Sequence, residues 1–499
     1  MARLSVADMA SAPLLAEEFP QDSIPLPSSS KFEFDPEKAV IPSRRTSFTP
    51  LVRNSIYHLC STCKGMFLYL LPSFIVTKYT GSSQNSRKLH PTAYLDGIRG
   101  VASFVVVIHH YLLDYFPHLH HGFAASPEYT SFLQFPFVRT IYAGRFAVPL
   151  FFVLSGYVLS YKSIRLIHDD NGSALLESLC SSIFRRGMRL FLPVIPATYY
   201  TMIMIHNGWH RSLNRTVKVP APLPLWNQTA HWSAEVQAML YPFTWQERRH
   251  IYGIQLWTLP IEFRASLVIF LTLLGLSKAQ TAFRMFVVGF LAVYSLATAA
   301  HWEMSLFFAG IMLAELNRIQ LKSKFNLKNF IQDRTKLHWA EQAIQGFWVL
   351  LFMFSWFLGC WPDKSADTSP GYVFFTSITP SNMPGDWGRT RFWATLAAPM
   401  MLLAMENFPM FRRPFLTPCA QYLGHISFAI YIVHSGICYS FGRMITLGIM
   451  DWTGVNWWGF MLAALIVVPS VVWIADVYWR LFDVTSVNFA RWVWNKSLK

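Results

Sequence analysis

Long apolar runs that carry almost no charge are the feature that most constrains the fold of this chain. Of its 499 residues, 53% are apolar and 14% are charged, whereas soluble domains carry about 25% charged residues. In lipid, such runs satisfy their backbone hydrogen bonds as helices. We therefore predict an all-α fold, a polytopic transmembrane bundle of about ten helices. The predicted spans are 93–116, 142–161, 187–206, 254–276, 283–299, 301–316, 342–361, 392–406, 424–446 and 457–479.

Composition divides the chain into three regions. Residues 1–90 mix Pro, Ser and charged residues without a period, which is typical of a disordered leader. Within this leader, the apolar stretch 66–76 is too short to cross a bilayer and is expected to form a helix at the membrane interface. Residues 91–482 hold the predicted transmembrane domain, and 483–499 form a tail.

The charge balance indicates membrane orientation rather than nucleic-acid binding. The chain has a net charge of +15, but its Lys and Arg residues lie between the apolar runs instead of on one module. Their excess on one side predicts that both termini are cytosolic, in the endoplasmic reticulum or another endomembrane. The loop 207–252 is basic as well, yet its acceptor sequons at Asn214 and Asn227 predict glycosylation on the lumenal side.

Motifs of several other enzyme classes are absent from the sequence. There is no GxSxG elbow, HExxH pair, Walker loop or GxGxxG turn, which removes the residues that hydrolases, zinc proteases and nucleotide-binding enzymes need. Cys60 and Cys63 have no second ligand pair, so no metal site is predicted.

The first predicted span carries an unusual density of ionisable residues. A charge at the bilayer centre costs about 2.5–3.5 kcal/mol, so each such residue is a functional hypothesis. Arg99 and His110 are eleven residues apart and project from the same stripe of a helix. Asp114, four residues after His110, can orient its imidazole. The alternative is that His110 is a packed histidine and that Asp96 pairs with Arg99 at the helix end.

Five blocks of the sequence resemble those of the acyltransferase 3 family of integral membrane O-acyltransferases. The first is the Arg99/His110 spacing, with ten residues between. The others are Arg145–Tyr157, Arg185–Pro193, Leu256–Phe263 and Leu423–His434. The sequence departs from the family pattern at Ala147, where Gly is common, and at Phe428, where Tyr is usual. The single-domain chain is similar to the fungal members that acetylate natural products such as meroterpenoids.

This resemblance implies transfer of an acetyl group from acetyl-CoA, a co-substrate rather than a bound cofactor, to a lipophilic alcohol such as a terpenoid. His110 is the expected base, because a neutral imidazole can take the alcohol proton. Glu262 is expected at a similar depth, where it can orient His110, although a structural pair with Arg264 or another helix is the alternative. Arg145, Ser155 and His434 are weaker candidates for substrate binding.

The acyl-CoA phosphates require cations on the cytosolic side. Arg185, Arg186 and Arg189 offer a triplet near one helix, and Arg99 is a further candidate. The triplet is equally typical of plain cytosolic loop charge.

Besides acyl-CoA and the alcohol acceptor, the expected partner of the chain is membrane lipid. A rival function is a proton-coupled transporter, in which the intramembrane Asp, Arg, His and Glu are relay groups.

Overall fold

The computed structural model describes residues 70–80, 89–210, 223–241, 247–299, 301–327 and 334–498, and this part of the chain is helical with no strands. The chain divides into two units, 1–85 and 86–499. In the first unit, α3 (Ser73–Thr80) overlaps the predicted interfacial segment and begins directly after Pro72. The rest of the predicted leader up to residue 69, including Cys60 and Cys63, lies outside the described residues.

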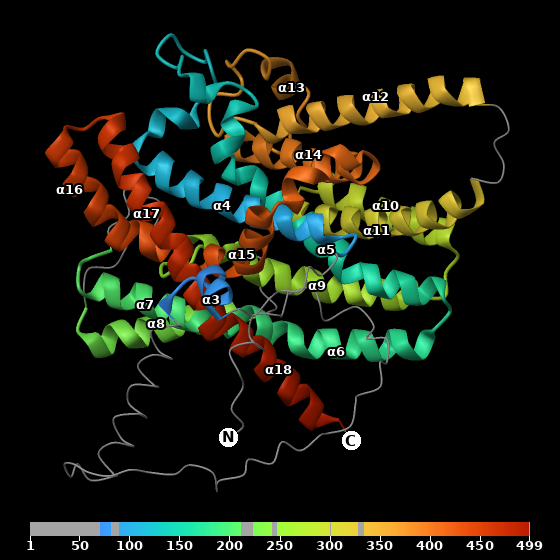
Figure 1. The fold of residues 1–499 in the computed structure, drawn as a ribbon, viewed down its shortest axis with the longest axis horizontal. Helices are drawn as coiled ribbons and strands as arrows, with labels where there is room; N and C mark the ends of the chain where they lie inside the picture. Colours follow the sequence, from blue (N-terminus) through green and yellow to red (C-terminus); the bar gives the residue numbers. More distant parts are fainter. Residues whose placement is uncertain are drawn as a thin grey trace, which may run out of the picture. The chain divides into compact units, whose positions relative to one another are not determined.

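The second unit consists of helices, several of which run side by side with nearly parallel axes (Figure 1). They are α4 (Ala93–Tyr115), α5 (Gly144–His168), α6 (Gly172–Phe191), α7 (Val194–His206), α8 (Leu225–Leu240), α9 (Thr258–Gly275), α10 (Thr281–Ala297), α11 (Trp302–Leu327), α12 (Arg334–Gly359), α13 (Val373–Ser377), α14 (Gly385–Asn407), α15 (Pro418–Ile437), α16 (Arg443–Thr453), α17 (Trp457–Tyr478) and α18 (Val484–Ser497). Two π-helical turns, Cys438–Gly442 and Trp479–Asp483, join α15 to α16 and α17 to α18.

The helical class is confirmed, but the count of about ten spans is not. Within the described residues, five helical segments are long and apolar enough to cross a membrane. They are Gly144–His168, Gly172–His206, Ile254–Gly275, Gln342–Gly359 and Trp457–Ser497.

Two predicted spans are interrupted in the structure. The predicted span 187–206 comprises the end of α6 and all of α7, which meet at Leu192 and Pro193 because proline supplies no backbone N–H to continue the first helix. The predicted span 424–446 contains the π turn that separates α15 from α16. The loop 207–252 contains a helix, α8, that hydropathy alone did not reveal.

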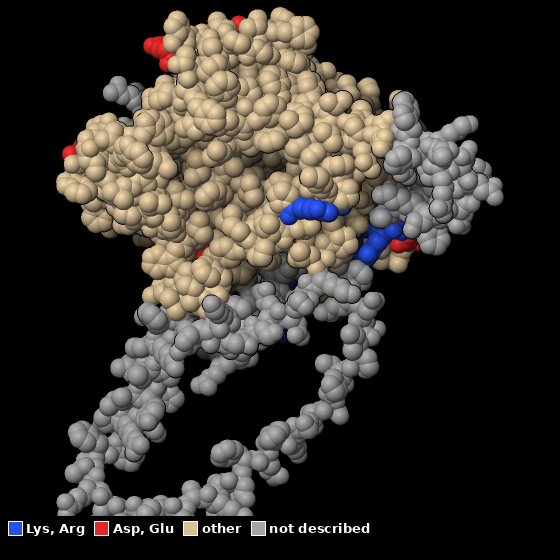
Figure 2. Space-filling view, turned by 45° about the horizontal axis from the view of Figure 1, so that its top comes forward, with Lys and Arg blue, Asp and Glu red and all other residues tan. Residues whose placement is uncertain are grey.

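Large apolar side chains cover the outside of the bundle, as expected where the solvent is lipid. On α10, Phe283, Phe286, Phe290 and Val293 are spaced three or four residues apart and are 56–70% exposed. This spacing places them on one face of the helix. Figure 2 shows a face of the molecule on which charged side chains are few. The apolar helices and their exposed faces identify a membrane protein.

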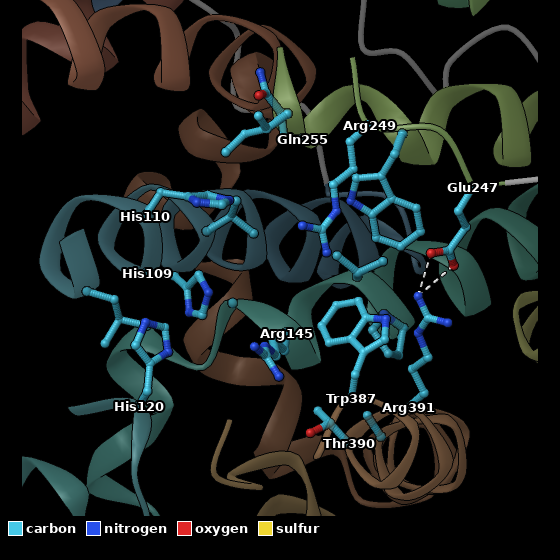
Figure 3. Close-up of a pocket in the computed structure, with 18 of the residues that line it drawn as sticks. His109, His110, His120, Arg145, Glu247, Arg249, Gln255, Trp387, Thr390 and Arg391 are labelled. Carbon is cyan, nitrogen blue, oxygen red and sulfur yellow. Dashed lines mark hydrogen bonds and ion pairs between the residues drawn. The ribbon is translucent and has the colours of Figure 1, made fainter. Parts of the chain in front are cut away.

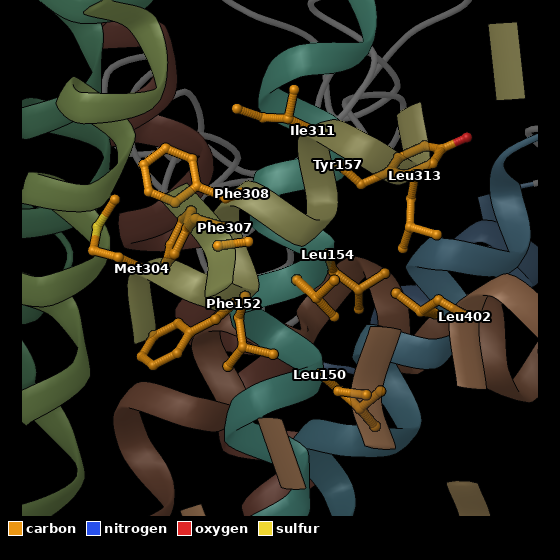
Figure 4. Close-up of a cluster of buried hydrophobic side chains, with 14 of the residues drawn as sticks. Leu150, Phe152, Leu154, Tyr157, Met304, Phe307, Phe308, Ile311, Leu313 and Leu402 are labelled. Atoms are coloured by element: carbon orange, nitrogen blue, oxygen red, sulfur yellow. The ribbon is translucent and has the colours of Figure 1, made fainter. Parts of the chain in front are cut away.

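A glycine crossing brings α5 against α11 and fixes the centre of the bundle. A Cβ atom on Gly156 would lie 2.3 Å from the carbonyl oxygen of Phe307, and one on Gly310 would lie 2.4 Å from the amide nitrogen of Tyr157. Large buried side chains, among them Phe152 and Phe307, fill the space on either side of this contact (Figure 4). Small residues therefore set the spacing of the two helices, as is common in membrane bundles.

A second glycine crossing brings α4 against α15. A Cβ atom on Gly100 would lie 2.3 Å from the amide nitrogen of Gly424, and one on Gly424 would lie 2.6 Å from the carbonyl oxygen of Asp96. The two helices that carry His110 and His434 are thus held with their backbones in contact. This contact fixes how the histidines of the two helices face each other.

We expect Gly310→Leu to lower the stability of the folded protein, because the new side chain would meet the backbone of α5 and overpacking costs about 1–3 kcal/mol. The measurement is the midpoint of thermal unfolding in detergent, together with the monodisperse fraction on size-exclusion chromatography. Gly346→Leu is the matched control, since a Cβ atom at Gly346 meets no atom within 4 Å. Equal stability of the two variants would contradict the glycine crossing.

Candidate active site

The ends of five helices converge on a cavity of about 590 Å³ at one end of the bundle. The last turns of α4 and α15 and the first turns of α5 and α14 contribute to its wall, together with the 3-10 turn Ile254–Trp257 that precedes α9. Figure 3 shows histidines on one side of this space, with Trp387, Arg391 and Glu247 on the other. The cavity therefore has an imidazole side and a tryptophan side.

Two adjacent histidines at the end of α4 line the imidazole side. His109 donates from Nδ1 to the carbonyl oxygen of Tyr142 at 2.9 Å, so Nε2 of the neutral ring is a proton acceptor. The ring of His110 lies edge-on to that of His109, with centroids 5.3 Å apart. Nδ1 of His110 lies 3.4 Å from the hydroxyl of Tyr439, a residue of the first π turn. The predicted base His110 is therefore a cavity residue.

His434 packs behind His110 and is not among the residues that line the cavity. Its ring stacks on that of His110 with centroids 5.3 Å apart, and its Nδ1 donates to the carbonyls of Ile430 and Tyr431. Its Nε2 is buried and has no hydrogen-bond partner among the described residues. In this position His434 supports the ring of His110, and it does not reach the cavity in which the predicted contact with substrate would be made.

Asp363, in the loop after α12, binds two side chains of the cavity wall. His120 donates from Nδ1 to Oδ2 at 2.7 Å, and Nε of Arg145 lies 3.2 Å from Oδ1. A second Arg145 nitrogen, Nη1, donates to the backbone carbonyl of Asp363 at 3.3 Å. Burial opposes ionisation of the carboxyl, but Arg145 and His120 outweigh it and hold the pKa of Asp363 well below its usual range.

Rings and guanidinium groups alternate along the cavity wall, from Arg145 beside the imidazole side to the tryptophan side. Trp387 lies between Arg145 and Arg391, each 4.6 Å from its ring centroid. Arg391 also lies 5.2 Å from the ring of Trp302 and donates to both carboxylate oxygens of Glu247 at 2.6 and 2.7 Å. These cation–π contacts and the ion pair join the rings and guanidinium groups of this wall to one another.

Asp114 lines the cavity, as expected for a neighbour of His110. The charged partner of its carboxylate in the described residues is Arg443, at 4.0 Å. No hydrogen bond joins Asp114 to His110 in the described part of the chain. In the described residues, Asp114 thus makes no direct contact that would orient the imidazole of His110, whereas the hydroxyl of Tyr439 lies within hydrogen-bonding distance of it.

Arg99 lies near the opposite end of α4, outside the cavity. Its guanidinium donates to the hydroxyl of Ser427 at 2.8 Å and to the carbonyl of Gly424 at 3.1 Å, and it pairs with Asp96 at 3.1 Å. Eleven residues rise about 16 Å along a helix, so Arg99 and His110 occupy different depths. Arg99 thus ties α4 to α15.

Glu262 contacts a predicted arginine rather than the predicted base. Nη2 of Arg186 donates to its Oε1 at 2.8 Å, and the hydroxyl of Ser155 donates to the same oxygen at 3.1 Å. The expected meeting of Glu262 with His110 is not seen, because a shared depth in the bundle does not fix the direction in which a side chain points. Ser155 likewise lies outside the cavity lining.

The other two arginines of the triplet lie close to Arg186 on α6. Arg185 donates to the carbonyl of Ser181 at 3.2 Å. Arg189 and Arg99 both interact electrostatically with the buried carboxylate of Asp483. The structure thus gathers the predicted cations at a level of the bundle separate from the cavity.

Of the two predicted glycosylation sites, Asn227 is an exposed residue of α8, and Asn214 lies outside the described residues.

Sequence reasoning missed His109, His120, Asp363 and Tyr439 as parts of one site. The run His118–His121, directly after the first span, was a visible signal for further imidazoles. Asp363 gave no local signal, because it reaches His120 and Arg145 only through the packing of a distant loop.

Comparison with known proteins identifies a family and several relatives. The Acyl_transf_3 family model, described as an acyltransferase domain, matches residues 92–480. The chain is 28% identical to the O-acetyltransferase PaAT-1 of Phomopsis amygdali over 84% of its own length and 88% of that protein. It is 26% identical to the acyltransferase clz18 of Cochliobolus lunatus, over 74% of this chain and 87% of the relative. It is 25% identical to the acyltransferase R4 of a Phoma species, over 74% and 85%.

No solved structure matches the chain. The family match covers most of the residues that build the helical unit, and it includes every residue that lines the cavity. It does not favour the transporter alternative. The chain is an acyltransferase and belongs to the acyltransferase 3 family.

Proposed function

We propose that this acyltransferase moves an acetyl group from acetyl-CoA to a hydroxyl of a lipophilic small molecule, a terpenoid or meroterpenoid, within the cavity. The observation that carries the proposal is the pairing, in one space, of imidazoles on one side with tryptophans on the other. One relative, PaAT-1, is named an O-acetyltransferase, which supports transfer of an acetyl group to a hydroxyl. The other two relatives are acyltransferases by name.

His110 is the proposed base. The hydroxyl oxygen of the acceptor attacks the thioester carbonyl carbon while the imidazole takes its proton. The carbon–sulfur bond then breaks, and the proton passes to the thiolate. The stacked ring of His434 and the hydroxyl of Tyr439 hold His110 in place for this task.

The size of the cavity and its tryptophan rings suit a compact acceptor with an apolar face. Pockets for small molecules usually measure about 300–1,000 Å³ and are lined mainly by apolar and aromatic side chains. This cavity falls within that range, and Trp257, Trp302 and Trp387 supply its flat apolar surfaces. A polycyclic alcohol can lie against these rings with its hydroxyl toward the imidazoles.

The donor is proposed to bind with its phosphates at Arg185 and Arg189 and with Arg99 nearby, so that the thioester points toward the cavity. Both α6 arginines are partly exposed, and guanidinium groups bind phosphates through paired hydrogen bonds. Because Arg99 and His110 lie on one helix, α4 spans the distance from the proposed phosphate site to the proposed base.

In cells, we place the protein in the endoplasmic reticulum or another endomembrane, with both termini in the cytosol and the cavity toward the lumen. The excess of Lys and Arg in the loops on the side away from the cavity supports this orientation, because such residues concentrate in cytosolic loops. The exposed position of Asn227 on α8 is compatible with glycan transfer on the lumenal side.

His110→Ala is expected to reduce acetyl transfer by about 10²–10⁴-fold, because proton transfer by a positioned side chain contributes that much to the rate. The assay follows labelled acetyl-CoA in microsomes or purified protein with a panel of hydroxylated terpenoids. His90→Ala is the control, since His90 is exposed and lies outside the cavity lining. His109→Ala should be milder than His110→Ala. Full activity of His110→Ala would remove this residue from the mechanism.

Arg185→Gln and Arg189→Gln are each expected to raise the KM for acetyl-CoA by about tenfold, because a hydrogen bond to a charged group contributes about 1.5–3 kcal/mol. The KM for the acceptor should not change. Lys278→Gln removes a cation that is 81% exposed and pairs with Asp170, so it controls for the loss of one positive charge. A KM for acetyl-CoA equal to that of wild type would assign these arginines to membrane orientation alone.

Asn227→Gln is expected to reduce the glycan-dependent mobility shift of the wild-type protein, and endoglycosidase treatment, which also acts on a glycan at Asn214, is expected to remove that shift completely. Asn171→Gln is the matched control, because Asn171-Gly-Ser is a sequon on the side predicted to be cytosolic. A glycan on Asn171 would reverse the proposed orientation of the chain.

A further inference from the structure

Asp363 fixes the relative positions of two side chains on the imidazole side of the cavity. One of its carboxylate oxygens accepts from His120, and the other lies against Nε of Arg145. The carboxylate is buried, with a residue exposure of 4%, and its low pKa keeps it charged. A charged carboxylate with both oxygens in use cannot rotate without breaking a charge-assisted hydrogen bond.

The backbone around Asp363 is tied down as well. The amide of Lys364 donates to the carbonyl of His120 at 3.0 Å, and the amide of Gly122 donates to the carbonyl of Lys364 at 3.3 Å. Arg139, which is buried, donates to the carbonyls of His120 and His121 at 3.0 Å each. The loop after α12 and the turn after α4 therefore form one fixed support for Arg145.

Arg145 keeps hydrogen-bond donors that this support does not use. A guanidinium has five N–H groups in a planar fork. Nε of Arg145 faces a carboxylate oxygen of Asp363, and Nη1 donates one hydrogen bond to the backbone carbonyl of Asp363. The face of the guanidinium lies over the ring of Trp387. Arg145 lines the cavity, and the described residues provide no hydrogen-bond acceptor for its second terminal nitrogen.

Arg145 also lines the same cavity as the histidine pair of α4. A Cβ atom on the preceding Gly144 would lie 2.5 Å from Cβ of His109, so the first turn of α5 presses directly against that histidine. Arg391, by contrast, lies against Trp302 and is neutralised by Glu247 on the tryptophan side. Of these two arginines, Arg145 is the one beside the imidazoles.

Acyl transfer from a thioester to a hydroxyl places a negative charge on the carbonyl oxygen. When the hydroxyl oxygen bonds to the carbonyl carbon, the hydroxyl proton goes to an imidazole and the π electrons of the carbonyl move to its oxygen. When the carbon–sulfur bond breaks, those electrons return to the carbonyl, the bonding pair leaves with sulfur, and sulfur takes the proton. A preorganised donor for the oxyanion is commonly the largest single contribution to such catalysis.

We propose that Arg145 is the catalytic residue that stabilises this oxyanion, and that Asp363 and His120 are the positioning residues that aim its guanidinium. This assignment rests on the proposed function. In this assignment, His110 takes the hydroxyl proton and Arg145 stabilises the negative charge on the carbonyl oxygen.

The test measures kcat and both KM values of the full-length protein with acetyl-CoA and the best acceptor from the terpenoid panel. Arg145→Ala is expected to lower kcat by about 10²–10³-fold with little change in either KM, as for removal of an oxyanion donor. Added guanidinium ion should restore part of the lost kcat, whereas an equal concentration of sodium ion should not. A merely structural role would not respond to guanidinium in this way.

Asp363→Asn and Arg145→Lys keep the fold testable if the alanine variant fails to fold. Asparagine retains an acceptor but loses the charge that aligns Arg145, and lysine keeps the charge but loses the planar fork. Both are expected to lower kcat by at least about tenfold at an unchanged KM. Arg389→Ala is the matched control for Arg145→Ala. Arg389 also pairs with an aspartate, Asp367, but it lies outside the cavity lining.

Two results have opposite meanings for the two proposals. If wild type transfers acetyl groups and the folded Arg145 and Asp363 variants keep the wild-type kcat, or change only a KM, the oxyanion assignment is overturned and the proposed function stands. If wild type transfers no acetyl group from acetyl-CoA to any acceptor, the proposed function is overturned, and the assignment with it.

Discussion

Contact between helix backbones at glycines is the constraint on which the rest of this structure depends. In lipid, helices gain little from burying apolar side chains against each other, so close packing and hydrogen bonds hold them together. Gly100 and Gly424 bring α4 against α15, and Gly156 and Gly310 bring α5 against α11. Through the first contact, His110 meets His434, and through the adjacent packing of α5 on α4, Gly144 meets His109 and places the next residue, Arg145, in the wall of the same cavity.

The cavity combines a rigid charged support with a rigid aromatic wall. Asp363 joins two segments that are far apart in the sequence, the turn after α4 and the loop after α12, and both join to the first turn of α5 through Arg145. On the other side, Arg391 and Glu247 hold Trp302 and Trp387. Asp363 with Arg145, and Glu247 with Arg391, are pairs of opposite charge, which limits the cost of placing these charges in a membrane protein.

Much of the fold could be predicted, because the apolar runs and the helical spacing are local properties of the sequence. The helices α4, α5, α9, α14 and α17 all lie on predicted spans. The break at Pro193 and the π turn after Ile437 were not visible as changes in hydropathy, so two interrupted segments were predicted as unbroken spans. In the site, His110 was predicted as an ionisable residue on an apolar span and lines the cavity, whereas Arg99, predicted with it from their spacing, lies outside the cavity. Glu262 was assigned to the wrong neighbour because depth along a helix gives no information on direction. Asp363 depends on long-range packing that no local pattern records.

The π turn Cys438–Gly442 has a consequence for how the cavity can change during evolution. A π turn holds one residue more than an α turn, so the helix after it is rotated by about 100° relative to an unbroken α-helix. Loss of one residue within this turn would restore α geometry and swing Tyr439 away from His110 without substituting either side chain. The hydroxyl that faces His110 is therefore specified by the length of the chain at this point as well as by the residue type. Relatives that differ by a single-residue insertion or deletion here would present a different group to the same histidine.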